Sequence, residues 1–202
     1  MKNTPEQKEE KRLKLDKAAT RAFLKEGYAH TTMNHIAAEA GMTKGNIYCY
    51  YASKEELFTS IVKPIFIKIE QLINSGYEKI LKSVRFDISP LEHNIDEAAA
   101  LFQQFRDETV LLFRRNKGSP YEDVRGSLTD GLYKQIVSLT EAYAAQKNKK
   151  IIKGTMYFRL LAMFWLESFL TAIDFSNTEE GIKEGITESV HIIFSSMMNA
   201  LE

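Results

Sequence analysis

Cysteine, proline and charge of a single sign are all scarce in this sequence. Its 202 residues include one cysteine and four prolines, and 27 Lys and Arg residues are balanced by 27 Asp and Glu residues. One cysteine cannot form a disulfide within the chain, which fits a reducing compartment, so we expect a cytoplasmic protein. Because there is no surplus of basic residues, a nucleic-acid-binding function needs support from a specific motif.

Long apolar segments are also missing. The start, MKNTPEQKEEK, has no apolar core and is not a signal peptide, and residues 1–10 are predicted to form a solvated arm. The most apolar stretch, 160–170, is interrupted by Glu167, and no run reaches the about 18 apolar residues that span a membrane. We therefore expect no membrane partner.

The sequence motifs of catalysis are absent as well. The chain has no nucleophile elbow, no glycine-rich phosphate loop and no paired His and Glu metal motif. Its four histidines and its cysteine do not have the spacing of zinc ligands. We expect that the protein is not an enzyme and that it has no metal and no cofactor.

The sequence does contain apolar residues at helical spacing along most of its length, which predicts an all-α protein. Turn residues separate these segments, and no convincing strand pattern or repeat appears. From about Asp87 onwards the chain is predicted to form further helices, with an N-cap and first turn at 89–90 that lead into 98–105 and 110–113. The other predicted helices cover about 11–26, 32–40, 43–51, 54 to beyond 70, 120–146, 151–175 and 178–201.

The stretch 31–57 has the most specific pattern. Thr32 is placed to cap the N-terminus of one short helix, Gly41 supplies the turn that ends it, and Thr43 caps a second helix. A Ser-x-x-Glu capping box at 53–56 starts a third helix. Helix, glycine turn and short helix form a helix-turn-helix, whose second helix enters the major groove of DNA.

The same stretch carries a longer ordered motif. It consists of Gly27, Tyr28, Thr31, Thr32, Ile36, Ala37, Ala40, Gly41, Thr43, Lys44, Gly45, Ile47, Tyr48, Tyr50, Tyr51, Ser53, Lys54, Glu55, Glu56 and Leu57. In this order the residues resemble the DNA-binding domain of TetR-family transcriptional regulators, over roughly 13–58. Two positions depart from the family's usual pattern: Ala52 stands where a polar residue is common, and Cys49 where an aromatic or polar residue often faces DNA.

The resemblance implies which residues contact DNA. Residues early on the second helix or on its outward side would meet base edges and thymine methyl groups. These residues are Lys44, Gly45, Asn46, Tyr48 and Cys49. Hydroxyl groups, helix N-termini and an ammonium group would bind phosphate. The residues that supply them are Thr31, Thr32, Thr43, Tyr50 and Lys54. The alternative that Tyr48 and Tyr50 are core aromatic residues stays open.

By the same resemblance, residues 1–53 form a helix-turn-helix domain of three helices and residues 54–202 a helical domain for effector binding and dimerisation. Aromatic and methionine side chains of the second domain are candidates to line a pocket, although their spacing is also typical of plain core. Glu167 is expected to be buried and to need a partner, either an arginine across an interface or a cationic ligand. The candidates are Phe102, Phe105, Phe113, Tyr121, Met156, Met163 and Glu167.

The last two predicted helices indicate a homodimer. Segment 151–175 is apolar almost all round and segment 178–201 has an apolar stripe, so pairing the two leaves one apolar side open. A two-fold partner would close this side into a four-helix bundle. The predicted seam consists of Phe164, Trp165, Ser168, Ile186, Val190, Ile193 and Met197.

The most consistent interpretation is a transcriptional repressor that binds a palindromic DNA operator as a homodimer and is released by a small-molecule effector. A second interpretation is a DNA-bound structural or cell-division factor on the same fold that senses no effector. A pocket in the C-terminal region would favour the first interpretation over the second.

Overall fold

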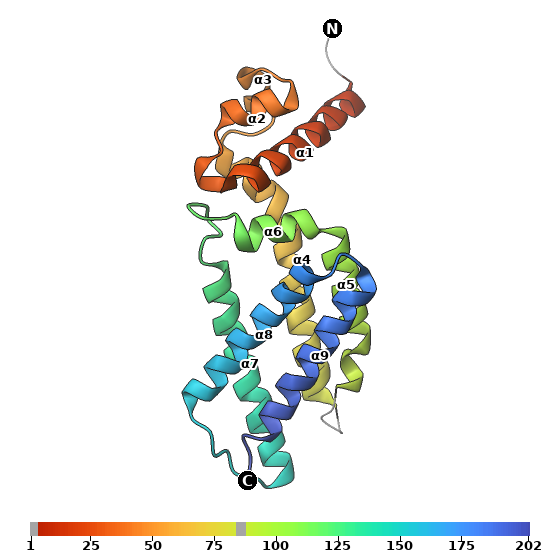
Figure 1. Cartoon of the computed structure of the whole chain (residues 1–202), viewed down its shortest axis with the longest axis vertical. Helices are drawn as coiled ribbons and strands as arrows, with labels where there is room; N and C mark the ends of the chain where they lie inside the picture. Colours follow the sequence, from red (N-terminus) through yellow and green to blue (C-terminus); the bar gives the residue numbers. More distant parts are fainter. Residues whose placement is uncertain (1–3, 84–87) are drawn as a thin grey trace. The chain divides into compact units, whose positions relative to one another are not determined.

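The computed structural model describes residues 4–83 and 88–202, and within these ranges the chain is built of helices (Figure 1). The one extended pairing among the described residues is an isolated antiparallel bridge between Ile151 and Leu201. The all-α prediction is therefore confirmed. Asp87, from which further helices are predicted, lies outside the described residues. The elements are α1 Pro5–His30, α2 Met33–Ala40, α3 Lys44–Tyr48, α4 Lys54–Lys82, the 3-10 turn η1 Ser89–Leu91, α5 Glu92–Gln104, α6 Arg106–Arg114, α7 Val124–Lys147, α8 Thr155–Phe175 and α9 Glu179–Met198.

The chain divides into two compact units. The first runs up to Ile67 and includes Asp107–Val124, and the second consists of Lys68–Arg106 and Arg125–Glu202. Helix α4 begins at Lys54, where the sequence suggests a domain boundary, and contributes residues to both units. A functional division between residues 53 and 54 stays a prediction.

Helix α1 begins earlier than its sequence pattern predicts. Thr4 caps it, because the Thr4 hydroxyl accepts from the backbone of Gln7 while the Gln7 side chain accepts from the backbone of Thr4. Residues 5–10, predicted as an arm, are therefore helical. Gly27 has a φ of 75°, which interrupts the helix, and the next amide, of Tyr28, donates to the carbonyl of Arg115 over 2.8 Å.

The core of the first unit joins α1 to the start of α4 through aromatic rings. Phe23 and Phe58 meet edge to face with ring centroids 5.1 Å apart, and Tyr28 meets Phe58 at 4.9 Å. Ile36 of α2 and Ile47 of α3 are fully buried in the same unit. These contacts fix the orientation of the two short helices on α1.

In the second unit, α9 packs against both α8 and α5 (Figure 1). Its apolar stripe is therefore core within one chain, and four residues of the predicted seam do not lie on an exposed face. Ile193, for example, is only 1% exposed. The stripe predicts a buried face correctly, but helices of the same chain cover this face, and this corrects the prediction that a partner chain does. The four residues are Ile186, Val190, Ile193 and Met197.

Helix α8 has an apolar composition that one buried face does not explain. Among the described helices it is the one that is long and apolar enough to cross a membrane, although only a third of its most apolar window is buried. Length and composition are weak criteria, because a helix at a protein interface meets them too. Exposed apolar residues occur along it: Met156, Leu160, Met163, Phe164 and Phe175.

The crossing of α8 and α9 depends on a glycine. A Cβ atom at Gly185 would lie 2.7 Å from the Cβ of Ala172, whereas one at Gly131 of α7 would meet nothing within 4 Å. We expect Gly185→Ala to lower the free energy of unfolding by about 1–3 kcal/mol through overpacking. Gly131→Ala, the matched control, should raise it by about 0.5–1 kcal/mol, since alanine is the better helix former. Urea unfolding measures both, and an equal gain in the two variants would refute the close crossing.

Candidate nucleic-acid interface

Two threonine caps and a glycine turn build the helix-turn-helix. The Thr32 hydroxyl accepts from the amide of His35 over 3.2 Å and starts α2. Gly41 ends α2 in the left-handed conformation, with a φ of 63°. The Thr43 hydroxyl then accepts from the amide of Asn46 over 3.2 Å and starts α3. The predicted caps and turn are confirmed.

Helix α3 is shorter than predicted. It ends at Tyr48, and the amides of Tyr50 and Tyr51 both donate to the carbonyl of Ile47 in a closing turn. The Tyr51 ring is buried, and its hydroxyl donates to Asp16 of α1 over 2.7 Å. This bond attaches the end of the short helix to α1, which explains why the chain turns there rather than continuing as a helix.

Asp16 was not expected from the sequence to serve this region. Burial raises the pKa of its carboxyl group, and the hydrogen bond from Tyr51 partly offsets that effect. Burial likewise raises the pKa of the Tyr51 hydroxyl. The signal that could have revealed Asp16 is its position between buried residues of α1, where an acidic side chain requires a donor.

Around the buried Ile47, α3 exposes all its other residues. Tyr48 is 47% exposed, so it is not a core aromatic residue, whereas Tyr50 is only half-buried and belongs fully to neither class. The Cys49 thiol is exposed and lies 3.5 Å from the carbonyl of Gly45. The structure thus brings five predicted residues together on one outward surface: Lys44, Gly45, Asn46, Tyr48 and Cys49.

Two residues predicted to bind phosphate have internal roles instead. Thr31 is 1% exposed, and its hydroxyl donates to the carbonyls of Gly27 and Ala22. The Lys54 ammonium donates to the carbonyls of Tyr28 and Thr31 over 2.7 and 2.9 Å and lies 4.2 Å from the centre of the Tyr28 ring. Burial lowers the pKa of Lys54. We therefore assign both residues to the end of α1 and not to DNA.

Lys54 yields a test of this reassignment. We expect Lys54→Met to lower the free energy of unfolding by about 1–3 kcal/mol, because two carbonyl groups lose a charged donor. Lys63→Met, an exposed lysine of the same helix and unit, should change it by less than about 0.5 kcal/mol. Denaturant titration distinguishes the two. If both variants are equally stable, the internal role of Lys54 is wrong and Lys54 is again a candidate for a DNA contact.

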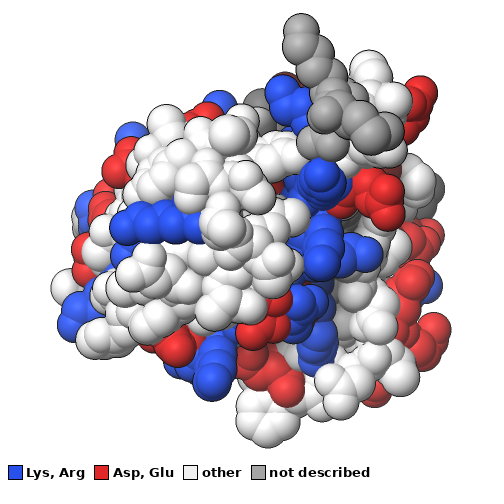
Figure 2. Space-filling model, turned by 90° about the horizontal axis from the view of Figure 1, so that it is seen from above, with Lys and Arg blue, Asp and Glu red and all other residues white. Residues whose placement is uncertain are grey.

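Helix α1 exposes basic side chains as well. Lys14 and Lys17 are exposed on α1 and Lys44 on α3. Figure 2 shows the Lys and Arg side chains of the molecule seen from above, where some form rows beside uncharged areas. Arg21 is not part of the free charge, because it pairs with Glu39 of α2 over 2.7 Å. Lysines of this kind bind phosphate groups as point charges. The sequence indicates them only as helix surface.

The residues predicted to line an effector pocket fall in both units. Phe113 and Tyr121 belong to the first unit, Phe102 is buried in the second, and Met156 and Met163 are exposed on α8. A pocket formed by these residues stays a prediction.

Glu167 corrects a prediction. It is half exposed rather than buried, and its carboxylate pairs with Arg125 of the same chain over 2.9 Å. The remaining candidate, Phe105, lies beneath the ammonium of Lys68, 4.7 Å from the ring centre.

An apolar surface remains open on the second unit. Phe164 of α8, a predicted seam residue, is 41% exposed, and Ile192 of α9 is 47% exposed. Leu160 lies one turn before Phe164 on α8 and is also exposed. Trp165 and Ser168, also predicted for the seam, are half-buried. Of the predicted seam, the exposed residue Phe164 lies on α8, and the predicted seam does not include the exposed apolar residues Leu160 and Ile192.

Comparison with known proteins gives one family. Residues 16–61 match the model of bacterial regulatory proteins of the tetR family. The HTH-type transcriptional regulator HbdR of Aromatoleum sp. (strain CIB) is 30% identical over 130 residues, which are 63% of this chain and 53% of that protein. The HTH-type transcriptional repressor BepR of Brucella suis biovar 1 (strain 1330) is 28% identical over 136 residues, 65% of this chain and 62% of that protein.

The fold is also found among solved structures. A member of the TetR transcriptional regulator family from Streptomyces coelicolor A3 superposes with a TM-score of 0.65 at 17% identity, over 90% of both chains. The chain spans about half the length of the curated relatives HbdR and YhgD, and the family model covers residues 16–61, which include the helix-turn-helix.

Proposed function

Because the chain belongs to the TetR family of bacterial regulatory proteins, we propose that it is a DNA-binding transcriptional regulator and not an enzyme. The observation that carries the proposal is the exposed surface of α3, presented by a helix-turn-helix whose caps and turn are formed as the motif requires. We place the protein in the cytoplasm, where DNA is accessible to it.

Helix α3 is proposed to enter the major groove. There the Lys44 ammonium can donate to guanine acceptors, and the Asn46 amide can pair with the N6 and N7 atoms of adenine. Gly45 allows the backbone to approach the bases closely, and Tyr48 with Cys49 offers apolar contact to thymine methyl groups.

Phosphate contacts would hold α3 in register. The exposed hydroxyls of Thr32 and Thr43, the half-buried Tyr50, and the lysines Lys14 and Lys17 of α1 are the proposed donors. Such contacts position a protein on the duplex without reading the sequence.

The protein is proposed to act as a homodimer through the exposed apolar side of α8 and α9. A two-fold axis would pair the Leu160 and Phe164 side of α8 with its copy and would cover Ile192 and Met163. A stable interface of this kind buries at least about 1,200 Å² in total. The same axis would direct two α3 helices to half-sites separated by about one helical turn or a multiple, which predicts a palindromic operator.

Repression relieved by a small-molecule effector is the proposed mode of regulation. The relative BepR carries the name of a repressor, and bound effector and bound DNA would each weaken the other's affinity by the same factor. The alternative, a DNA-bound structural or cell-division factor, is not favoured, because the named relatives are transcriptional regulators.

Selection of bound duplexes from a random library tests the proposal. Purified full-length protein is expected to enrich a palindromic sequence, with binding that weakens steeply as salt is raised. A library that shows no enriched sequence after repeated selection would reject sequence-specific DNA binding.

A further inference from the structure

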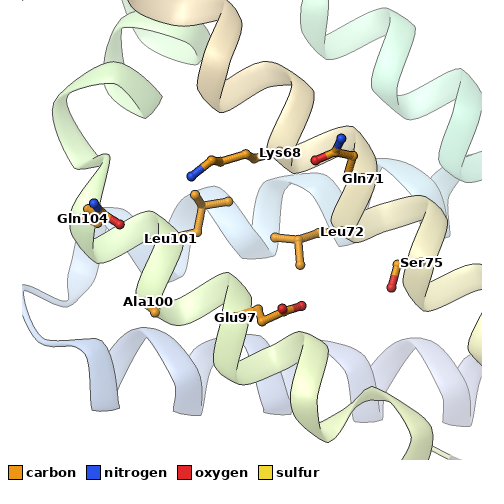
Figure 3. Close-up of a pocket in the computed structure, with 8 residues that line it drawn as sticks. All are labelled: Lys68, Gln71, Leu72, Ser75, Glu97, Ala100, Leu101 and Gln104. Carbon is orange, nitrogen blue, oxygen red and sulfur yellow. The ribbon is translucent and has the colours of Figure 1, made fainter.

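A polar pocket of about 440 Å³ lies between α4 and α5 in the second unit (Figure 3). Each helix supplies a stripe at the i, i+3, i+4, i+7 spacing that places side chains on one face. Its volume falls in the range of small-molecule sites. The lining residues are Lys68, Gln71, Leu72 and Ser75 of α4, and Glu97, Ala100, Leu101 and Gln104 of α5.

Contacts at both ends set the two helices antiparallel and hold the pocket walls. At one end the Lys68 ammonium lies over the ring of Phe105, which follows α5. At the other end the buried Asn94 of α5 donates to the Leu72 carbonyl over 3.3 Å and to the Ser75 hydroxyl over 3.1 Å. Its side-chain oxygen also accepts from Lys79. The polar network at this end is satisfied, so the wall is fixed without a ligand.

Opposite charges stand at the two ends of the pocket and do not pair with each other. Figure 3 shows the Lys68 nitrogen on the side of Gln104 and the Glu97 carboxylate below Leu72, toward Ser75. Within residues 4–83 and 88–202 Lys68 has no ion pair, and Glu97 pairs only with His93 of its own helix, over 3.3 Å. Between the charges lie the side chains of Leu72 and Leu101.

This pattern selects a class of ligand. An apolar molecule would desolvate an ammonium and a carboxylate without offering either a partner. A simple anion would be repelled by Glu97, and a simple cation by Lys68. A molecule that carries both charges with a short apolar part between them satisfies every group, and the side-chain amides of Gln71 and Gln104 are available to its remaining polar atoms.

We propose that the pocket between α4 and α5 binds a small ω-amino acid, a zwitterion whose two charges are separated by a short apolar chain, with its carboxylate facing Lys68 and its ammonium facing Glu97. The site deepens the proposed function and, as an effector site, rests on it. Helix α4 follows directly after the helix-turn-helix and supplies half of the pocket lining, so a ligand that fixes α4 against α5 acts on the helix that the DNA-binding region precedes.

Titration calorimetry of the full chain with a series of ω-amino acids of increasing chain length tests the site. At least one amino acid is expected to bind, and its N-acetyl and amide derivatives, which each lack one charge, should bind about tenfold more weakly. Binding should be lost in Lys68→Glu and in Glu97→Lys, and the double substitution should restore it in reversed orientation. The matched controls Lys134→Glu and Glu141→Lys change exposed residues of α7 and should leave binding unchanged.

Three results would overturn the proposal: no ω-amino acid of the series binds, a charge-blocked derivative binds as well as its parent, or the charge reversals at Lys68 and Glu97 act no more strongly than the controls. Melting temperatures of all variants establish that they are folded. A gel shift with and without the bound amino acid then separates the two claims. If the ligand leaves DNA affinity unchanged, the pocket is a binding site but not an effector site. If the protein binds no DNA at all, the proposed function is rejected, and calorimetry still measures binding in the pocket.

Discussion

The double substitution Phe164→Glu and Ile192→Glu is expected to convert the dimer to folded monomers and to lower operator affinity by about 10²–10⁴-fold. Both side chains are exposed within one chain, so charge there does not disturb the core of the unit. In the proposed dimer they are buried, and an unpaired carboxylate in an apolar interface is strongly unfavourable. A monomer then contacts one half-site only and loses the effective concentration that joins the two.

Sedimentation velocity and a gel shift measure the two consequences. Leu81→Glu, which places the same charge on an exposed apolar residue of α4, serves as the control and should leave the dimer intact. The equivalent change at Ile193 is no test, because that residue is 1% exposed in the single chain and its charging would unfold the protein. If the dimer persists after the Phe164 and Ile192 substitutions, the interface lies on another surface of the chain.

The second large effect is expected at Tyr48. Tyr48→Ala should weaken binding to the selected operator by about 10- to 100-fold, the size of one good base contact, and should leave the salt dependence unchanged. The free energy of unfolding should not fall measurably, since the ring is 47% exposed.

Lys17→Ala provides the contrast to Tyr48→Ala. A lost phosphate contact should weaken binding to all sequences alike and reduce the salt slope by about one unit. Gel shifts over a range of salt concentrations, on operator and on unrelated duplex, measure both variants. If Tyr48→Ala binds the operator as tightly as the unmodified chain, the proposal that α3 enters the major groove is wrong.

Local signals in the sequence were sufficient for the helix-turn-helix. The caps at Thr32 and Thr43 and the left-handed turn at Gly41 each depend on hydrogen bonds within a few residues, so the residue types alone reveal them. Burial of Ile47 follows from the same short-range periodicity, whereas the exposure of Tyr48 is decided only by the structure.

Roles that depend on distant parts of the chain could not be predicted. Lys54 donates to the carbonyls of Tyr28 and Thr31 at the end of α1, 26 and 23 residues away in the sequence, and Thr31 is buried there. The end of α3 is set by the bond between Tyr51 and Asp16, which are 35 residues apart.

The prediction that the α9 stripe lies in a dimer interface is wrong for a different physical reason. A stripe such as that of Ile186 and Ile193 shows that a helix face is buried, yet nothing in its periodicity says whether the same chain or a second copy covers it. The pocket between α4 and α5 is hidden for a similar reason, because two ordinary amphipathic stripes align only once η1 and Asn94 have set the two helices side by side.

Hydroxyl-radical footprinting of the full-length protein on its selected duplex tests the central claim, that two α3 helices of a homodimer read a palindrome. The expected result is two protected patches, related by two-fold symmetry and centred about one helical turn, roughly 34–36 Å, or a multiple of it apart. A single protected patch, or protection that is uniform along the duplex and independent of its sequence, would contradict it.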